Sequence, residues 1–209
     1  MNQKTLRNAI IAKSDNIGTH LGLIDTLLAL DKCTKKQDIL LISENAAQAW
    51  RLISQRGEIC ATGDVLSVAA GCALAIRDGN AICLVGDGEL QYGSVWECAL
   101  FANARRLPII AIVNRNGIQL DGQTENIMPL EPLEAKWRAF GWSVMECDGH
   151  SQRDIIESIE EARQKNGPVA IITHTIPGKD IPFIENSEKW HKKLTDAQKE
   201  IARAYINNG

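Results

Sequence analysis

The sequence lacks the features that mark membrane, secreted and nucleic-acid-binding proteins. It has no apolar run of about 18 residues, the length a membrane-spanning helix requires, and no apolar stretch with a small-residue cleavage site opens it. Its 23 basic and 26 acidic residues give a net charge of −3, so there is no basic excess to attract a nucleic acid. We therefore expect a cytoplasmic protein that binds neither membranes nor nucleic acids.

Closely spaced cysteine pairs are also missing. None of the six cysteines lies at Cys-x-x-Cys spacing from another, so we expect reduced core residues rather than a metal or redox site. No internal repeat or low-complexity tract interrupts the chain. What remains is an ordinary globular composition, 44% hydrophobic over 209 residues. A chain of this size can form one compact domain without disulfides.

Apolar strands alternate with helices along most of the chain. Strands are expected at residues 39–42, 81–85, 109–113, 143–146 and 169–172. Helices are expected as two stretches in the first thirty residues, the second at 21–30, and then at 46–54, 65–76, 95–103, 152–165 and from 196. This alternation predicts an α/β fold, a doubly wound and mostly parallel sheet with helices on both faces. We expect a single domain over 1–209, with 175–209 as a C-terminal wrap-around tail.

Two loops that follow neighbouring strands carry polar residues. Gly86-Asp87-Gly88 comes directly after one apolar strand, and the next strand ends in Asn114-Arg115-Asn116-Gly117-Ile118. Taken alone, the first triplet is typical of a simple tight turn. However, adjacent parallel strands lie about 5 Å apart and ligands bind beyond their carboxyl ends, so both loops can reach one ion. A carboxylate, an amide oxygen and a backbone carbonyl suit Mg²⁺, which predicts a metal and diphosphate site.

These residues resemble the thiamine-diphosphate signature of the transketolase family. The resemblance is carried by Gly86-Asp87-Gly88-Glu89-Leu90-Gln91, Trp96-Glu97, Asn114-Arg115-Asn116-Gly117-Ile118-Gln119-Leu120-Asp121-Gly122, Asp148-Gly149-His150 and His174-Thr175-Ile176-Pro177-Gly178-Lys179. It covers nearly the whole chain and is greatest for the small N-terminal subunit of split, two-chain transketolases.

The resemblance implies a set of site residues. Asp87, the side chain of Asn116 and the main-chain oxygen of Ile118 would hold Mg²⁺ or Ca²⁺, and this metal would bridge the two phosphates of thiamine diphosphate. The other cofactor-binding residues implied are Gly63, Gly86, Gly88, Glu89, Lys179 and His191. His191 is also the only catalytic candidate on this chain.

The resemblance also implies a partner. It covers only the diphosphate-binding half, so a C-terminal, pyrimidine-binding transketolase-like subunit would complete the site in an α2β2 heterotetramer. That subunit would supply the glutamate that activates the cofactor. We therefore expect a transferase of aldehyde or ketone residues that is inactive without its partner.

The sequence departs from the family on the substrate side. Asn16 and Asn45 stand where relatives have two active-site histidines, and they are the expected substrate-contacting residues. Tyr92 likewise replaces a glutamate. Asparagine cannot carry a proton at neutral pH, so we expect ketol transfer or carboligation on a modified sugar or another specialised metabolite instead of pentose phosphates. His20 is either a displaced substitute or a plain helix-face histidine.

Three alternatives concern the function. A 2-keto acid decarboxylase that transfers an acyl or aldehyde group would use the same cofactor, and a noncatalytic cofactor-binding subunit would retain the metal loops. A nicotinamide-binding fold is disfavoured because no glycine-rich loop follows the first strand.

The indoles of Trp96, Trp137, Trp142 and Trp190 are expected to pack or anchor an interface, with Trp96 and Tyr92 as the interface candidates.

Overall fold

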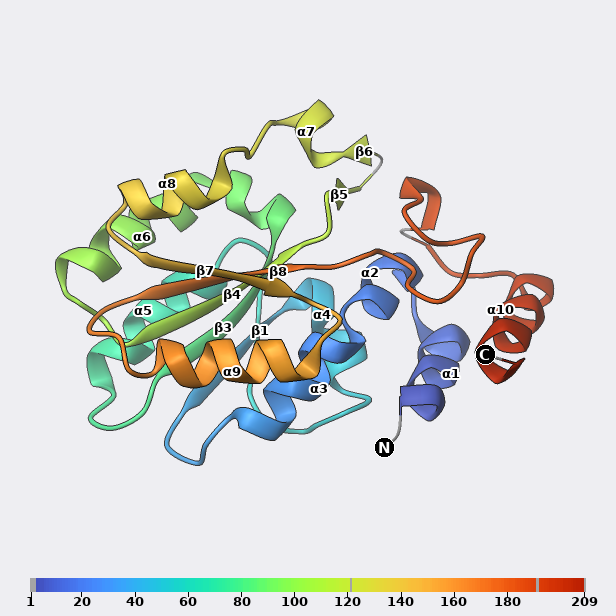
Figure 1. The fold of residues 1–209 in the computed structure, drawn as a ribbon, viewed down its shortest axis with the longest axis horizontal. Helices are drawn as coiled ribbons and strands as arrows, with labels where there is room; N and C mark the ends of the chain where they lie inside the picture. The colour runs from blue at the N-terminus through green and yellow to red at the C-terminus, as the bar shows by residue number, and fades with distance from the viewer. Residues whose placement is uncertain (1–2, 121, 191, 209) are drawn as a thin grey trace.

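A six-stranded parallel sheet forms the centre of the molecule (Figure 1). The computed structural model describes residues 3–120, 122–190 and 192–208. The strands are β1 (Ile39–Ser43), β2 (Glu58–Cys60), β3 (Ala81–Gly86), β4 (Ile109–Arg115), β7 (Ser143–Asp148) and β8 (Val169–His174). They lie in the order β2-β1-β3-β4-β8-β7, and every neighbouring pair is parallel. The predicted α/β fold is confirmed.

Helices cover both faces of the sheet, which explains the continuous apolar runs of its central strands. One face carries α1 (Gln3–Lys13), α2 (Ile17–Gly22), α3 (Ile24–Cys33), α4 (Glu44–Trp50) and α9 (Gln152–Ala162), and the other carries α5 (Val65–Ala75), α6 (Gly93–Ala104) and α8 (Leu133–Ala139). Successive strand residues point to opposite faces. Ile82 and Leu84 of β3 therefore enter the first core, while Cys83 and Val85 enter the second.

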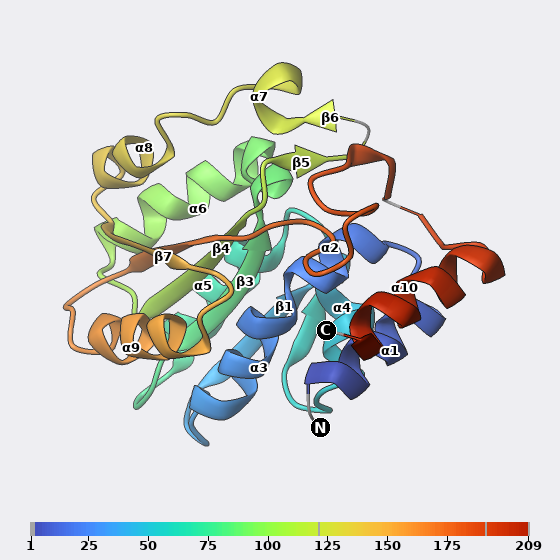
Figure 2. The ribbon, with the colours of Figure 1, turned by 45° about the vertical axis from the view of Figure 1, so that its right-hand side comes forward.

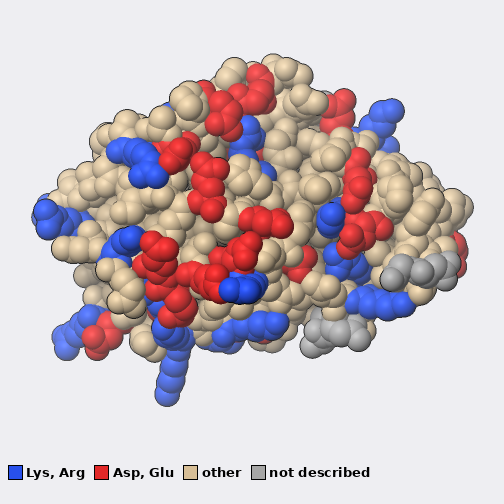
Figure 3. Space-filling view, in the orientation of Figure 1, with Lys and Arg blue, Asp and Glu red and all other residues tan. Residues whose placement is uncertain are grey.

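The C-terminal segment returns to the beginning of the chain. After β8 it passes η2 (Glu188–Trp190) and ends in α10 (Asp196–Asn208), which lies beside α1 (Figures 1 and 2). Ala202 and Ile206 of α10 are buried in the first core. Within the described residues, none of the helices is both long and apolar enough to span a bilayer. Acidic and basic side chains are interspersed on the face shown in Figure 3.

Several short elements were not predicted. They are β2, α8, the antiparallel pair β5 (Ile118–Gln119) and β6 (Gly122–Gln123), and α7 (Thr124–Ile127). The first thirty-odd residues form three helices instead of the two expected, because the chain bends at Asp15-Asn16 and again at Leu23. Strands of two or three residues are too short to show a periodic pattern, so only their tertiary pairing reveals them.

A cluster of aromatic rings packs α6 and α8 together. The Trp96 ring centroid lies 5.2 Å from that of Trp137 and 5.0 Å from that of Phe140, and Trp137 lies 4.7 Å from Trp142. The indole of Trp96 donates a 2.7 Å hydrogen bond to the Leu90 carbonyl, at the end of η1 (Asp87–Gln91). Trp190 packs in the same way against Phe183, with 5.5 Å between ring centroids. These indoles pack within the fold, and the rings around Trp96 support the loop that follows β3. The expected interface role of Trp96 and Tyr92 remains a prediction.

Candidate cofactor and metal site

A cavity of about 240 Å³ opens where β3 and β4 end. Gly86 of β3 pairs with Asn114 of β4, so the loops that follow both strands begin side by side. The cavity is lined by Asn16, Thr19, Asn45, Thr62, Gly86, Asp87, Gly88, Glu89, Tyr92, Asn114, Asn116, Ile118, Gln119 and Leu120. Most of the predicted site residues thus meet in one place. Gly63 and Lys179 lie outside this lining, and His191 lies outside the described residues.

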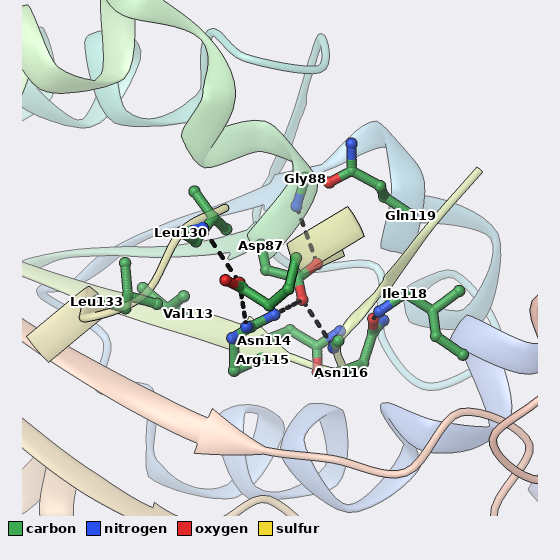
Figure 4. A network of polar contacts seen from close by, with 12 residues as sticks. Asp87, Gly88, Val113, Asn114, Arg115, Asn116, Ile118, Gln119, Leu130 and Leu133 are labelled. Carbon is green, nitrogen blue, oxygen red and sulfur yellow. Dashed lines mark hydrogen bonds and ion pairs between the residues drawn. The ribbon is translucent and has the colours of Figure 1, made fainter. Parts of the chain in front are cut away.

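Asp87 is buried at the start of η1, directly after β3 (Figure 4). Its Oδ2 accepts hydrogen bonds from the Gly117 N–H at 2.8 Å and from Arg115 Nη1 at 2.9 Å, whereas Oδ1 accepts one from the Gly88 N–H at 2.9 Å. Burial raises the pKa of Asp87 above its ordinary value, because the hydrogen bonds and the Arg115 charge only partly offset the lost hydration.

Asn116 and Ile118 provide further oxygen atoms. Asn116 Oδ1 accepts a 2.8 Å hydrogen bond from the Ile118 N–H, which holds the amide in a tight turn around Gly117. Among the residues that the structure describes, no three His, Cys, Asp or Glu side chains gather as metal ligands. A cation here would need a mixed set of carboxylate, amide and carbonyl oxygens, and that set suits Mg²⁺ or Ca²⁺. The residues present fit such an ion.

Glu89 joins two loops at the floor of the cavity. This buried carboxylate accepts hydrogen bonds from the Gly63 N–H at 3.0 Å and from the Gly86 N–H at 2.8 Å. Gly63 has a φ of +85°, and a Cβ there would lie 2.8 Å from the Tyr92 ring, so only glycine fits. Although Gly63 does not line the cavity, it lets Tyr92 and Glu89 take their positions there.

Asn16 and Asn45 stand between two cavities. Both line the 240 Å³ cavity and also a neighbouring one of about 530 Å³, which is shared with charged residues including Lys13 and Arg51. Asn16 Oδ1 is buried and finds no hydrogen-bond partner within the described residues. The two amides therefore contribute to the lining of both cavities.

His20 and Lys179 do not line the 240 Å³ cavity. The buried His20 ring lies with Nδ1 2.6 Å from Ser14 Oγ and Nε2 2.9 Å from the Asn45 carbonyl, so it holds the backbone of Asn45. His20 also lines the 530 Å³ cavity beside Asn16 and Asn45, and its role as a displaced substitute remains a prediction. Lys179 lies in the turn after β8, near His150. Its predicted contact with the cofactor remains a prediction.

A larger hollow, about 1060 Å³, lies between α1 and α10. Arg7 and Asp180, which form an ion pair with each other, line it together with apolar residues of α10. None of the strand-end side chains described above reaches this hollow. Its size alone therefore does not make it the candidate site.

Sequence comparisons identify the family. Residues 67–207 match the family described as "Transketolase, thiamine diphosphate binding domain". The chain belongs to this family. It is 42% identical over 151 residues to the 6-deoxy-6-sulfo-D-fructose transketolase subunit SqwG of Clostridium sp. (strain MSTE9), a match that covers 69% of this chain and 55% of the relative. It is 38% identical over 144 residues to an apulose-4-phosphate transketolase subunit of Phocaeicola vulgatus, covering 66% and 51%.

The transketolase resemblance seen in the sequence is thereby confirmed, including its likeness to relatives that are named as subunits. The chain spans about half the length of these curated relatives. Among solved structures, the transketolase of Campylobacter jejuni has a TM-score of 0.82 at 23% identity, covering 98% of this chain and 41% of that one. The Leishmania mexicana transketolase has a TM-score of 0.73 at 18% identity, covering 100% and 45%. These structures support the transketolase-type fold.

Sequence reasoning missed several residues of the transketolase-family cavity. Thr19 comes from a distant part of the chain, and no local pattern points to it, whereas Thr62 directly precedes Gly63, which was a candidate. Asn114 could have been found, because side chains alternate along a strand and Asn116 two positions later was already a candidate. Arg115 lies between these two asparagines and contacts Asp87, a contact that the spacing of the motif does not reveal.

Proposed function

We propose that this chain is the N-terminal, diphosphate-binding subunit of a thiamine-diphosphate-dependent transketolase-like enzyme. The convergence of Asp87, Asn116 and Ile118 at the carboxyl ends of two neighbouring strands is the observation that carries the proposal. In it, the Asp87 carboxylate, Asn116 Oδ1 and the Ile118 carbonyl hold Mg²⁺ or Ca²⁺ against the cofactor phosphates. When bound, thiamine diphosphate supplies a nucleophilic ring carbon and an electron sink for ketol transfer.

The glycines and Glu89 shape the place of the diphosphate. Gly86 and Gly88 carry no side chain that would separate the backbone from a phosphate, and a Cβ on Gly88 would already lie 3.2 Å from Gln119. Glu89 holds Gly63 and Gly86 by hydrogen bonds, so that both loops are fixed before a ligand enters. Lys179 and His191 complete the proposed set of cofactor-binding residues.

The size and rim of the cavity support a partner chain. Complete small-molecule sites enclose roughly 300–1,000 Å³, whereas this cavity measures about 240 Å³. Tyr92 is 50% exposed and Leu120 is 73% exposed at its lining, which leaves apolar surface uncovered. We infer that a C-terminal subunit covers this rim and binds the pyrimidine ring, in an α2β2 heterotetramer, and that it carries the group that activates the cofactor.

The proposed substrate is a modified sugar. The relatives named above include subunits of transketolases for 6-deoxy-6-sulfo-D-fructose and for apulose 4-phosphate. In this chain Asn16 and Asn45 offer neutral amides at the junction of two cavities, where they can hydrogen-bond hydroxyl or carbonyl oxygens without exchanging a proton. We therefore propose ketol transfer or carboligation on a modified sugar.

Calorimetry with Mg²⁺ and thiamine diphosphate tests the proposed cofactor site. The chain assembled with its C-terminal subunit should bind the cofactor only when the metal is present, and Asp87→Ala should weaken this binding at least about 100-fold because it removes the charged ligand. Asp196→Ala, on the exposed start of α10, is the matched control and should bind normally. The proposal fails if the wild-type assembly shows no metal-dependent binding.

Turnover assays test the activity. The chain alone should be inactive, and the assembly should transfer a ketol unit between modified sugars. Release of carbon dioxide from a 2-keto acid would point instead to the decarboxylase, and cofactor binding without any turnover would point to a noncatalytic subunit. If xylulose 5-phosphate and ribose 5-phosphate were the best substrate pair, the proposed specificity would be wrong.

A further inference from the structure

Arg115 lies directly behind the proposed metal site. It is the last residue of β4, between Asn114 and Asn116, whose side chains both line the cavity. Because side chains alternate along the strand, that of Arg115 leaves on the other side, and it is not part of the cavity lining (Figure 4). Its side chain is only 10% exposed. A nearly buried cation is therefore fixed on the side of Asp87 that faces away from the cavity.

One guanidinium group contacts three carboxylates. Arg115 Nη1 donates to Asp87 Oδ2 at 2.9 Å, Nη2 donates to Glu125 Oε1 at 2.7 Å, and both Nε and Nη2 donate to Glu131 Oε1, at 3.2 and 3.1 Å. The carboxylates differ in their access to water. The side chains of Glu125 and Glu131 are 37% and 55% exposed, whereas that of Asp87 is 3% exposed. Asp87 thus depends on Arg115 for its counter-charge far more than the two glutamates do.

The contacts also orient the Asp87 carboxylate. Oδ2 is taken by Arg115 and by the Gly117 N–H, whereas Oδ1 accepts one hydrogen bond, from the adjacent Gly88 N–H. Oδ1 therefore keeps a lone pair for a further ligand. A planar guanidinium that bonds Asp87 and two other acceptors at fixed angles restrains the rotation of the carboxylate more than a single ammonium charge would.

We propose that Arg115 is a positioning residue for the metal and diphosphate. It holds the Asp87 carboxylate from behind so that Oδ1 faces the cavity, and its charge offsets that of Asp87 beside an incoming polyanion. This inference rests on the proposed function, because it assigns Arg115 a role in binding the same metal and cofactor. Asp87 and Glu89 are both buried acids in the cavity lining, and the described lining residues include neither lysine nor arginine, so Arg115 offsets an acidic charge that the lining itself does not.

Arg115 also anchors a neighbouring segment, and the test must separate this effect. Glu125 accepts hydrogen bonds from the Leu130 and Glu131 N–H groups, and Glu131 accepts one from the Leu133 N–H. Removing Arg115 would therefore loosen the chain between α7 and α8 as well as Asp87. Glu125→Gln weakens the contact to this segment and leaves the ion pair between Arg115 and Asp87 in place.

The experiment measures the Mg²⁺ affinity of the assembled enzyme at saturating thiamine diphosphate, by calorimetry, for four variants. Arg115→Gln should weaken Mg²⁺ binding about 10- to 100-fold, because the Asp87 carboxylate loses the guanidinium that holds its Oδ2 and orients its Oδ1. Arg115→Lys restores a charge without the planar fork and should be about threefold to tenfold weaker than wild type. Glu125→Gln should stay within about threefold. Arg163→Lys changes a buried ion pair at the opposite edge of the sheet and should bind like wild type.

The outcomes distinguish the two proposals. A wild-type assembly that shows no metal-dependent binding overturns the proposed function itself. If wild type binds and Arg115→Gln binds equally well, the positioning role is wrong while the proposed function stands. Equal weakening in Arg115→Gln and Glu125→Gln would show that Arg115 acts only through the α7–α8 segment, which also overturns the inference. If Arg115→Gln does not fold, the lysine variant decides, and wild-type affinity in that variant overturns the role of the guanidinium fork.

Discussion

Each edge of the parallel sheet buries an aspartate paired with an arginine, and the two pairs differ in how the carboxylate is satisfied. At the amino edge, Asp38 precedes β1 and pairs with Arg163 at the end of α9, with 2.6 Å between Oδ2 and Nη2. At the carboxyl edge, Asp87 pairs with Arg115 at 2.9 Å. Both aspartate side chains are almost fully buried, 0% and 3% exposed. Both side chains are thus shielded from water, but Asp87 lies deeper in the protein than Asp38, and their hydrogen bonds also differ.

The Asp38 carboxylate has two donors on each oxygen. Oδ1 accepts from the Asn80 N–H and from Arg163 Nη1, and Oδ2 accepts from the Lys35 N–H and from Arg163 Nη2. Burial by itself raises the pKa of Asp38, but these hydrogen bonds outweigh it and hold the pKa below its ordinary value. The pKa of Asp87 shifts the other way.

The difference separates a structural carboxylate from one that can bind a ligand. Asp38 accepts hydrogen bonds from the loops before β1 and β3, and neither of its oxygens is left for another partner. Asp87 keeps an oxygen with a single donor and lines a cavity. A buried acid that is incompletely satisfied is costly unless a cation joins it, and the carboxyl edge is where α/β sheets bind ligands.

The largest effect on stability is expected at the amino edge. Asp38→Asn would place an amide group against N–H donors and leave Arg163 with only the half-exposed Glu160 as a counter-ion. Because breaking a buried pair leaves an uncompensated charge, we expect a loss of about 3–5 kcal/mol in the free energy of unfolding, measured by urea denaturation. Cofactor binding by the folded fraction should be unchanged. A loss below about 1 kcal/mol would show that the pair does not hold this edge together.

The same substitution at the carboxyl edge should cost less. In Asp87→Asn the Arg115 guanidinium keeps Glu125 and Glu131 as counter-ions, so we expect about 1–2 kcal/mol in the same denaturation assay. Metal-dependent thiamine diphosphate binding should nevertheless be lost, which calorimetry would detect. If Asp87→Asn destabilised the fold as much as Asp38→Asn while binding persisted, the assignment of the two edges would be reversed.

Much of this difference between the two edges of the sheet could be predicted from the sequence. The fully apolar runs of β3 and β4 fix the two central strands, and the polar residues directly after them, Asp87 and Asn116, must then share one edge. β2 escaped prediction because its three residues begin with the exposed Glu58 and show no pattern. The role of Arg115 was not predictable for a different reason. Its partner Glu125 lies in the short helix α7, and its partner Glu131 lies in the loop before α8. The positions of both segments depend on packing between distant parts of the chain.

The smallest effect concerns His150, which follows β7 at the carboxyl edge. Its Nε2 accepts a 2.8 Å hydrogen bond from the Ile176 N–H, so the neutral ring must carry its proton on Nδ1. Nδ1 is buried without a hydrogen-bond partner among the described residues and lies 4.0 Å from Asp25 Oδ2. Burial lowers the pKa of His150 below its ordinary value, and Lys179 lowers it further. Asp148, Asp25 and Asp180 oppose this shift.

This shift predicts acid sensitivity at the carboxyl edge. In the unfolded chain His150 takes up a proton near pH 6.5, whereas the folded chain resists it, so stability is full above that pH and falls as the pH drops toward the folded pKa. The lowered pKa of Asp38 keeps its contribution constant until about pH 4. His150→Gln retains an acceptor for the Ile176 N–H. Between about pH 7 and 5.5, the free energy of unfolding measured in urea should therefore fall by up to about 1 kcal/mol less in this variant than in wild type. His174→Gln, at an exposed hydrogen bond with Glu146, is the control. An unchanged pH slope in His150→Gln would place the acid sensitivity elsewhere in the fold.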